Sequence, residues 1–254
     1  MAAGISVDDS VYVNASRLRH SVSCPGALYA TTVVEKDARS VKVKLPNGVI
    51  SDWIATKYVH HKVGISIIQF GDFTNESANL DPLSKGILQN ARILYGDDST
   101  VSYWKIRSES ELDYLFRSNS LSYSDKIILI AHGSEEGNLS IGASSIDAFT
   151  LGGFVAETPN PPQGGWEFIC AICHSGRASF GKKLSESKNV NFVLGPMHQS
   201  HSSEMAQFVQ TYLNYHLLAG FTSTVAAKYA RNAATGEAKF RMWKNGVRQS
   251  LTYG

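Results

Sequence analysis

Several features that would define a class of protein are scarce or missing in this sequence. Only three of its 254 residues are cysteine, and an odd, low count does not build a disulfide framework. No apolar run approaches the roughly 20 residues that cross a bilayer, and the start MAAGISVDDS lacks the basic and apolar regions of a signal peptide. We therefore expect a cytoplasmic protein with no membrane partner, in which a thiol stays free and reduced.

An excess of charge of one sign is also missing. The formal net charge is +2, and acidic and basic residues are mixed along the chain, whereas nucleic-acid-binding proteins gather positive charge in patches. No nucleic-acid partner is expected. Hydrophobic residues make up 43% of the chain and charged residues 18%, which provides for a packed core and argues against wholesale disorder.

The hydrophobic pattern changes near residue 62, which predicts two domains, 1–62 and 63–254. In the first domain, short β-type segments alternate with turns such as Asn47-Gly48, a hairpin signal. This pattern predicts a small all-β barrel, and the spacing and aromatic residues resemble SH3-like or Tudor-like barrels. Its aromatic residues form either a core or a peptide-binding surface. The expected strands are 11–13, 27–34, 41–45 and 49–54, and the aromatic residues are Tyr29, Trp53 and Tyr58.

In the second domain, apolar strands alternate with helical patterns, which predicts an α/β domain with a mostly parallel sheet flanked by helices. Asp81-Pro82 is a typical helix start, and Ser108 with Glu111 forms a capping-box pattern. Asn245-Gly246 predicts a closing hairpin. The expected strands are 63–70, 101–106, 126–131, 167–172, 190–194, 239–243 and 247–253, with later helices around 205–213 and 225–230.

Two of these strands end in reactive side chains, one in His132 and the other in Cys173. Ligands bind beyond the carboxyl ends of the strands in open parallel sheets, so both residues are expected at one edge of the sheet. A thiol with a pKa of about 8.5 is only a few per cent ionised at neutral pH. A neighbouring imidazole can accept its proton and later protonate a leaving amine. The pair therefore predicts nucleophilic catalysis by Cys173 with His132 as its catalytic partner.

An acyl-transfer site also needs donors for the oxyanion of its tetrahedral intermediate. The backbone amides of Gly133 and Cys173 are the candidates, because Gly133 has no side chain to block an approaching carbonyl. A helix expected soon after Ser175-Gly176 would additionally favour the thiolate through its N-terminus.

The two segments carry a specific resemblance. IAHGSEEGNLSIG resembles the His-Gly segment of caspases, in which an acidic, glycine-containing turn leads into a short hairpin. FICAICHSG resembles the strand-Cys segment of caspase-like peptidases, and is similar above all to their CHAT branch (caspase-associated, tetratricopeptide-linked). The order His then Cys, and the strand, loop and two helices that follow, extend the resemblance over roughly residues 63–245. It departs from the family at Ile172, where a small residue usually stands, and at His174.

The resemblance implies a caspase-like (clan CD) cysteine endopeptidase that needs no cofactor and no metal. It implies a protein or peptide substrate, controlled cleavage in signalling or bacterial defence, and a possible regulatory partner for the amino-terminal barrel. Asp72 lies near the position where relatives read the P1 side chain, so a basic P1 residue would pair with it; a turn-capping acid is the alternative. Ser175 and His198 are the other expected substrate-binding residues.

Other interpretations stay open at this point. Cys170 and Cys173 form a C-x-x-C that could be a redox pair, although residues three apart in a strand face opposite sides. The two cysteines with His174, His198 and His201 could form a zinc set, although the spacing fits no compact zinc motif. The chain could also be a non-catalytic interaction module, or a thiol hydrolase or acyltransferase acting on a non-peptide substrate.

Overall fold

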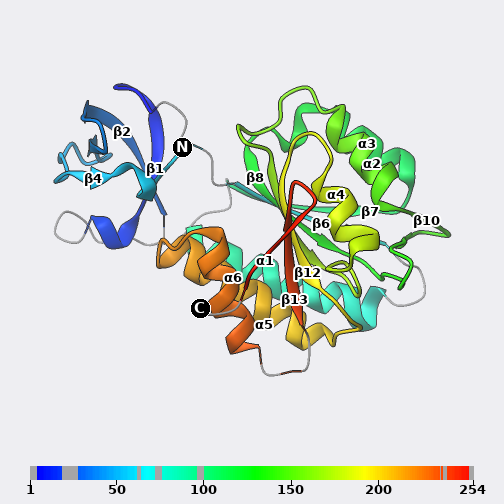
Figure 1. The fold of residues 1–254 in the computed structure, drawn as a ribbon. Coiled ribbons are helices and arrows are strands. Elements are labelled where there is room, and N and C mark those ends of the chain that lie inside the picture. Colours follow the sequence, from blue (N-terminus) through cyan, green and yellow to red (C-terminus); the bar gives the residue numbers. More distant parts are fainter. Residues whose placement is uncertain are drawn as a thin grey trace.

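The computed structural model describes residues 5–18, 28–61, 64–71, 76–95, 100–234, 236 and 239–251. It contains a small five-stranded sheet, built from the amino-terminal residues, beside a seven-stranded sheet flanked by helices (Figure 1). A separate two-stranded hairpin follows the third strand of the large sheet. Among these residues, no helix combines the length and the apolar character that a bilayer crossing requires.

The small sheet is antiparallel throughout, in the order β4-β3-β2-β1-β5. The predicted strand 49–54 is mostly wrong, since only its last residue lies in a strand. Val43 N in β3 donates to the hydroxyl of Ser51 at 3.0 Å, whereas a regular ladder would supply a backbone carbonyl as the acceptor. The pairing with β3 is interrupted at this point. The amino-terminal region is built mainly of β-strands, as expected. That these strands close into an SH3-like barrel stays a prediction. The strands are β1 (Ser10–Asn14), β2 (Leu28–Lys36), β3 (Ser40–Lys44), β4 (Ile54–Ala55) and β5 (Val59–His60).

The large sheet has the order β14-β13-β12-β11-β8-β6-β7. The strands from β7 to β12 in this order are parallel, and β13 and β14 are antiparallel to their neighbours. The mostly parallel α/β fold is thus confirmed. The strands are β6 (Gly64–Phe70), β7 (Val101–Ile106), β8 (Ser124–Ile130), β11 (Trp166–Ala171), β12 (Val190–Pro196), β13 (Phe240–Lys244) and β14 (Val247–Gln249).

The closing hairpin turns where the sequence predicts. Asn245 and Gly246 both have positive φ, 49° and 72°, as a two-residue turn matching the twist of its strands requires. The last strand is shorter than the predicted 247–253, because β14 ends at Gln249; Ser250 and Leu251 continue outside the ladder, and residues 252–254 lie outside the described residues.

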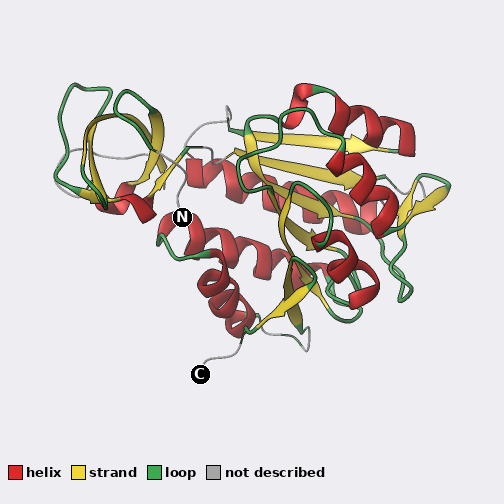
Figure 2. Cartoon of the chain, turned by 45° about the horizontal axis from the view of Figure 1, so that its top comes forward, coloured by secondary structure: helices red, strands yellow, loops and turns green. Residues whose placement is uncertain are grey.

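Helices cover both faces of the large sheet (Figures 1 and 2). Alternation along β8 explains why: Ile128 and Ile130 pack on the α1 and α5 side, whereas Ile127 and Leu129 pack on the α2 and α3 side. The first face carries α1 (Asp81–Tyr95), α5 (Ser202–Leu213) and α6 (Ser223–Ala233), and the second carries α2 (Glu109–Arg117), α3 (Ala148–Ala156) and α4 (Lys183–Ser185).

Shorter elements complete the chain. The hairpin after β8 is the one that the family resemblance implies, and Ser108 caps α2 by accepting from Glu111 N, as predicted. These elements are β9 (Leu139–Ile141), β10 (Ser144–Ile146), η1 (Ala15–Arg17), η2 (Thr56–Tyr58), η3 (Glu76–Leu80), η4 (Asn119–Leu121), η5 (Ala178–Lys182) and η6 (Asn214–Leu218).

The small sheet contacts the helical face of the large one. Asn14, fully buried at the end of β1, donates through Nδ2 to the carbonyl of Leu217 in η6. Leu28 of β2 belongs to the same hydrophobic cluster as α1 and α5, and Tyr12 packs against that cluster. The boundary predicted at residues 62 and 63 lies outside the described residues.

Candidate active site

The carboxyl ends of β8 and β11 lie next to each other. The strands are parallel neighbours, with Leu129 opposite Cys170 and Ile130 opposite Ala171. Each strand ends at the second of these pairs. His132 and Cys173 each come two residues after the end of one of these strands. The sequence predicts both residues at the same edge of the sheet.

The backbones of the two segments touch. A Cβ added at Gly133 would collide with the carbonyl oxygen of Cys173 and would lie 2.6 Å from Ile172 Cγ2. No other residue would fit at position 133 without a shift of the cysteine turn. The His132-Gly133 segment and the Cys173 turn are therefore side by side.

The two amides proposed as oxyanion donors are not used by the surrounding ladder. Gly133 lies opposite Leu139 of β9 at a position where the two facing residues do not bond to each other. The hydrogen bonds are made by the residues on either side, for example from Ser140 N to His132 O at 3.0 Å. Among the described residues, no backbone carbonyl accepts from Cys173 N. Both amides are thus free of backbone partners in this part of the chain.

Cys173 and Cys170 have different surroundings. Cys173 is partly exposed, packs against the cluster on the α1 and α5 face, and has its Sγ 3.8 Å from the carbonyl oxygen of Ser200. Cys170 is 2% exposed and belongs to the cluster on the opposite face, where burial raises the pKa of its thiol. Both thiols are free. The two cysteines therefore do not form a redox pair in this structure.

The turn after Cys173 is tightly held. His174 has a left-handed backbone, with φ of 63°, which histidine tolerates better than most residues, and its amide donates to His198 O at 3.3 Å. Ser175 is 1% exposed, and its hydroxyl donates to Ile172 O at 2.8 Å. The hydroxyl of Ser175 closes the turn, so its placement lends no support to the expected role in substrate binding.

The helix expected after Ser175-Gly176 begins at Ala178, after a turn. Gly176 N donates to Pro196 O at 2.7 Å, which ties the chain to β12 before it can coil. Helical structure starts only at Ala178, with Arg177 as its N-cap. The helix N-terminus is therefore separated from Cys173 by a complete turn of chain.

Arg177 connects three segments at this edge, and the sequence did not point to it. Its Nε donates to Met197 O at 3.0 Å, beyond the end of β12. Its Nη1 lies 3.2 Å from Glu135 Oε2, in the turn that follows His132. The sequence could have indicated Arg177 only through its place four residues after Cys173, because both partners come from distant segments.

The remaining predicted site residues are dispersed. Asp72 lies outside the described residues. The side chain of His198 is exposed beyond β12. His201 caps α5, with Nδ1 accepting from Ser203 N. Among the residues that the structure describes, no group of three or more His, Cys, Asp or Glu is arranged to hold a metal ion.

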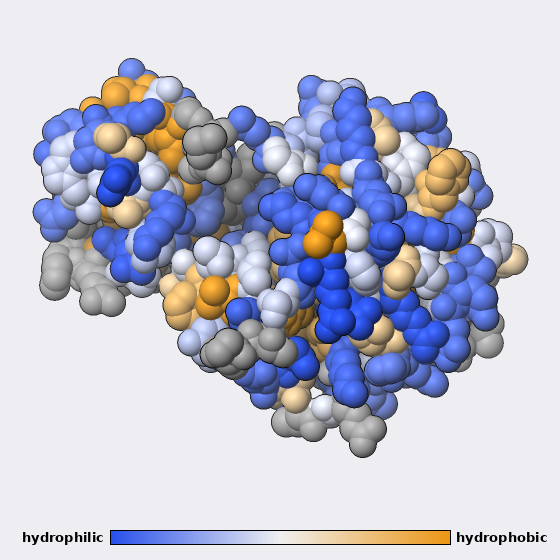
Figure 3. All heavy atoms as spheres, viewed as in Figure 1, coloured by the Kyte–Doolittle hydropathy of each residue, from blue (hydrophilic) through white to orange (hydrophobic). Residues whose placement is uncertain are grey.

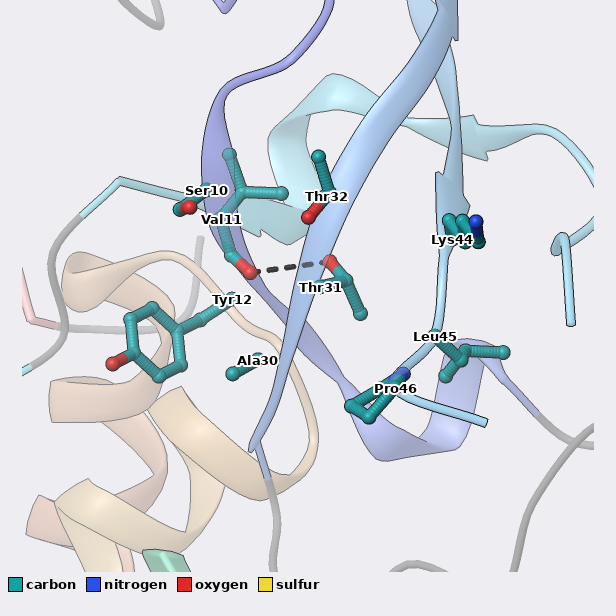
Figure 4. Close-up of a pocket in the computed structure, with 9 residues that line it drawn as sticks. All are labelled: Ser10, Val11, Tyr12, Ala30, Thr31, Thr32, Lys44, Leu45 and Pro46. Atoms are coloured by element: carbon teal, nitrogen blue, oxygen red, sulfur yellow. Dashed lines mark hydrogen bonds between the residues drawn. The ribbon is translucent and has the colours of Figure 1, made fainter. Parts of the chain in front are cut away.

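A cavity of about 460 Å³ on the small sheet lies apart from these residues (Figure 4). It has one charged residue, Lys44, and the hydroxyl of Thr31 at its wall donates to Val11 O at 3.1 Å. The three aromatic residues considered as either a core or a peptide-binding surface do not line it: Tyr29 and Tyr58 pack against the core of the small sheet, while Trp53 is 48% exposed. The lining residues are Ser10, Val11, Tyr12, Ala30, Thr31, Thr32, Lys44, Leu45 and Pro46.

Comparison with known proteins gives limited matches. No protein-family model and no curated protein matches the chain. Similar solved structures include a secreted C11 cysteine protease from Bacteroides thetaiotaomicron in complex with an irreversible peptide inhibitor, which is 10% identical with a TM-score of 0.49 over 72% of this chain. They also include pro-sf-caspase-1, 15% identical with a TM-score of 0.45, over 61% of this chain and 74% of that one. This chain spans 66% of the C11 protease, just under two thirds of its length. At these values the likeness assigns neither a family nor an activity.

Proposed function

We propose that this chain is a cysteine endopeptidase with a caspase-like domain of the CHAT-like branch, in which Cys173 is the nucleophile and His132 its catalytic partner. The observation that supports this most is the backbone contact between Gly133 and Cys173 at neighbouring strand ends. Alternation adds to it: Ile128 and Ile130, like Ile169 and Ala171, face α1 and α5. Continued for two residues, the same alternation directs His132 and Cys173 to one side of the sheet.

In the acylation step, the His132 imidazole accepts the proton of the Cys173 thiol, and the thiolate attacks the scissile carbonyl carbon. The oxyanion that forms accepts hydrogen bonds from the amides of Gly133 and Cys173. When the intermediate collapses, the C–N bond breaks and the imidazolium protonates the leaving amine. The acyl group is then held as a thioester on Cys173.

In the deacylation step, His132 accepts a proton from water as the water oxygen attacks the thioester carbonyl. The C–S bond breaks, the carboxylic acid leaves, and the proton returns to the sulfur. Neither step requires a metal ion or an organic cofactor. Cys170 takes no part, because it is buried on the other face of the sheet.

The wider role is part of the same proposal. The substrate is a cytoplasmic protein cut at few sites, in signalling or bacterial defence, with Asp72 as the candidate reader of a basic P1 residue. The small sheet, as an SH3-like module, recruits a partner or controls access to the site. This assignment of the small sheet is by analogy between folds.

The test is labelling of the full chain with acyloxymethyl-ketone peptides that differ at P1, with the site of the adduct identified by mass spectrometry. Wild type is compared with Cys173→Ala, His132→Ala and Cys170→Ala. We expect an adduct on Cys173 whose rate depends on P1 and on His132, with Cys170→Ala unchanged as the matched control.

Two outcomes would favour the alternatives. Equal, slow alkylation of all thiols, with no dependence on P1, would favour a non-catalytic interaction module. Labelling of Cys173 that depends on His132 but responds only to non-peptide thioesters or amides would favour a thiol hydrolase or acyltransferase.

A further inference from the structure

A tryptophan of the closing hairpin reaches the turn formed by residues 173–176. Trp243 lies in β13, and its indole Nε1 donates to the carbonyl oxygen of Gly176 at 2.8 Å. The two residues are 67 positions apart in the sequence. The outer surface of the β13–β14 hairpin is mostly hydrophilic in Figure 3, whereas Trp243 is only 8% exposed. The indole therefore points into the protein and ends at the turn that carries Cys173.

Gly176 is the residue at which this turn is anchored to the sheet. Its carbonyl accepts from Trp243 of β13, and its amide donates to Pro196 O of β12 at 2.7 Å. A Cβ added at Gly176 would collide with the carbonyl oxygen of Gly195, so the turn lies directly against the backbone of β12. Both backbone polar groups of Gly176 are thus bonded to strands of the sheet, three residues after Cys173.

Gly181 leaves the space that the indole needs. A Cβ at this position would lie 2.7 Å from Trp243 Cδ1 and 2.6 Å from Ser175 O, which is closer than a side-chain carbon can approach. Gly181 therefore lies between the turn and the indole, and its lack of a side chain lets both approach. The Arg241 guanidinium, 5.6 Å from the centre of the indole ring, adds a cation–π contact on the same strand.

Trp243 holds the turn from the face of the sheet opposite to the thiol. Trp243 is directly opposite Val193, whose side chain belongs to the cluster on the α2 and α3 side, and residues that face each other across two strands share a face. Cys173 packs against the cluster on the α1 and α5 side. A bond from Trp243 can therefore fix the turn without covering the thiol.

We propose that Trp243 is a positioning residue for Cys173, and that its indole N–H acts by fixing the carbonyl of Gly176. This inference rests on the proposed peptidase function, in which the thiolate must be aligned with His132 and with the oxyanion donors. Catalytic rates are sensitive to shifts of about 1 Å in such an alignment. Gly176 is buried, so loss of the N–H removes a donor that water does not readily replace, and the turn shifts.

The test compares Trp243→Phe with Trp166→Phe in the full chain. Trp166 is the matched control, because its Nε1 also donates to a backbone carbonyl, that of Ser124 at 3.1 Å, but at the amino ends of β8 and β11. Labelling with an acyloxymethyl-ketone peptide over a range of concentrations separates the maximal rate of inactivation, kinact, from the binding constant, KI. We expect Trp243→Phe to lower kinact about tenfold, the factor that corresponds to one hydrogen bond, with KI unchanged. Trp166→Phe should leave both at the wild-type values.

Amide hydrogen exchange gives a second readout that does not need catalysis. Mass spectrometry follows exchange in the segment 173–181, which contains the Gly176 amide. We expect this amide to exchange about tenfold faster in Trp243→Phe than in wild type, because the turn opens more often. Trp166→Phe should exchange in this segment as wild type does.

A second pair of variants keeps the tryptophan and changes the space beside it. Gly181→Ala places a methyl group between the indole and the turn, so it tests the proposal even where Trp243→Phe fails to fold. Gly153→Ala is its control, because an added Cβ there meets no atom within 4 Å. Gly181→Ala should lower kinact as Trp243→Phe does, and Gly153→Ala should not.

The outcomes separate this proposal from the proposed function. A purely structural role would lower the stability of both tryptophan variants and leave kinact unchanged, which would overturn the proposal. Unchanged exchange of the Gly176 amide in Trp243→Phe would overturn it as well, whatever the chain catalyses. Wild type that shows no labelling dependent on P1 and on His132 would instead contradict the proposed function, and with it the positioning role.

Discussion

The same face of β8 and β11 carries polar residues at both ends, and the two ends differ in what surrounds them. At the amino end, Lys126 is directly opposite Glu167, and its Nζ lies 2.7 Å from Asp125 Oδ2 and 3.3 Å from Glu167 Oε2. At the carboxyl end, about 20 Å away at the rise of a β-strand, come His132 and Cys173. The Lys126 side chain is 1% exposed, whereas Cys173 is partly exposed.

The amino end is closed by other elements. Ser223 of α6 donates to Glu167 Oε1 at 2.9 Å, and Tyr212 of α5 donates to Glu167 Oε2 at 3.4 Å. Burial alone would lower the pKa of Lys126 and raise that of Glu167. The charges of Asp125 and Glu167 reverse the shift of Lys126, and the charges of Lys126 and His216 reverse the shift of Glu167. Ion pairing keeps these groups charged inside the protein. The comparison teaches that the strands hold buried charges as structure at one end and leave the Cys173 thiol partly exposed at the other.

The largest expected effect concerns the carboxyl end. His132→Ala should reduce the rate of Cys173 labelling by about 10²- to 10⁴-fold, the usual contribution of a general acid–base group. The free energy of unfolding should change by about 1 kcal/mol, the typical effect of one substitution at a partly buried position. Labelling kinetics and urea denaturation measure the two effects. A large loss of stability with an unchanged rate of labelling would show that His132 is a structural residue and not the catalytic partner of Cys173.

The amino end should show the opposite behaviour. Lys126→Met leaves the buried carboxylates of Asp125 and Glu167 without their cation, and we expect a loss of about 3–5 kcal/mol in the free energy of unfolding. The folded protein should still label at Cys173 at the wild-type rate. Urea denaturation measures the loss, and adding Glu167→Gln should restore part of it. The exposed Lys188→Met is the control, and a loss for Lys126→Met no greater than for this control would contradict the prediction.

A pH dependence should follow from His60, where the small sheet meets the amino end. Burial, with the charges of Lys126 and His216, lowers the pKa of His60 from 6.5 to about 3. The unfolded chain therefore binds the proton first, and stability is lost as the pH falls from 6.5 toward 3. Between pH 7 and pH 5 the loss from His60 is about 2 kcal/mol.

His60→Gln should remove this loss, whereas substitution of the exposed neighbour in His61→Gln should not. Asp125 acts in the opposite direction in both proteins, because burial raises its pKa from 3.8 to about 6 and stability is gained as the pH falls through that window. The difference between wild type and His60→Gln, from urea denaturation at pH 7 and pH 5, isolates the histidine. A difference that does not vary with pH would contradict the buried, neutral state of His60.

The smallest effect should come from Arg177. Arg177→Gln removes the link between the turn after His132 and the segment after β12, and we expect about a tenfold slower labelling of Cys173 through misplacement of the turn. Stability should change by about 1 kcal/mol or less, since the Glu135 side chain of this ion pair is 65% exposed. Glu135→Gln removes only one of the two contacts and should have a weaker effect. If Glu135→Gln slows labelling as much as Arg177→Gln, the bond to Met197 is not what positions the turn.

Much of the fold followed from local pattern. Ser108 marks a true helix start, and the apolar run before His132 is a buried strand of a parallel sheet. Periodicity and capping succeed here because each depends on neighbouring residues only. The helix start predicted at Asp81 is wrong, because the helical segment η3 runs directly into α1 and the Asp81 carboxylate accepts from Gln69 instead of capping the helix. The strand predicted at 49–54 is reduced to a single bridge between Ile50 and Lys44 and a short strand from Ile54, because the Ser51 hydroxyl takes the place of a ladder carbonyl between them.

Part of the candidate site followed from the sequence in the same way. His132 and Cys173 could be placed at one edge because each follows a buried strand, and strand ends of a parallel sheet meet at one edge. The role of Arg177 could not be read, because its partners Glu135 and Met197 are far away in the sequence. The bond from Gly176 to Pro196 of β12, which ties down the chain before Ala178, was equally hidden, because its acceptor lies on a distant strand.

By itself, the sequence determined the α/β class, the strands and the two residues on which the proposed chemistry depends, because hydrophobic periodicity and the order of residues are local properties of the chain. Only the tertiary structure decided that Gly133 touches Cys173 and that Lys126 is buried between two carboxylates. Those facts depend on which strands become neighbours and on what covers each end of the sheet. Such choices are made by packing between distant segments, whose energy no single stretch of sequence contains.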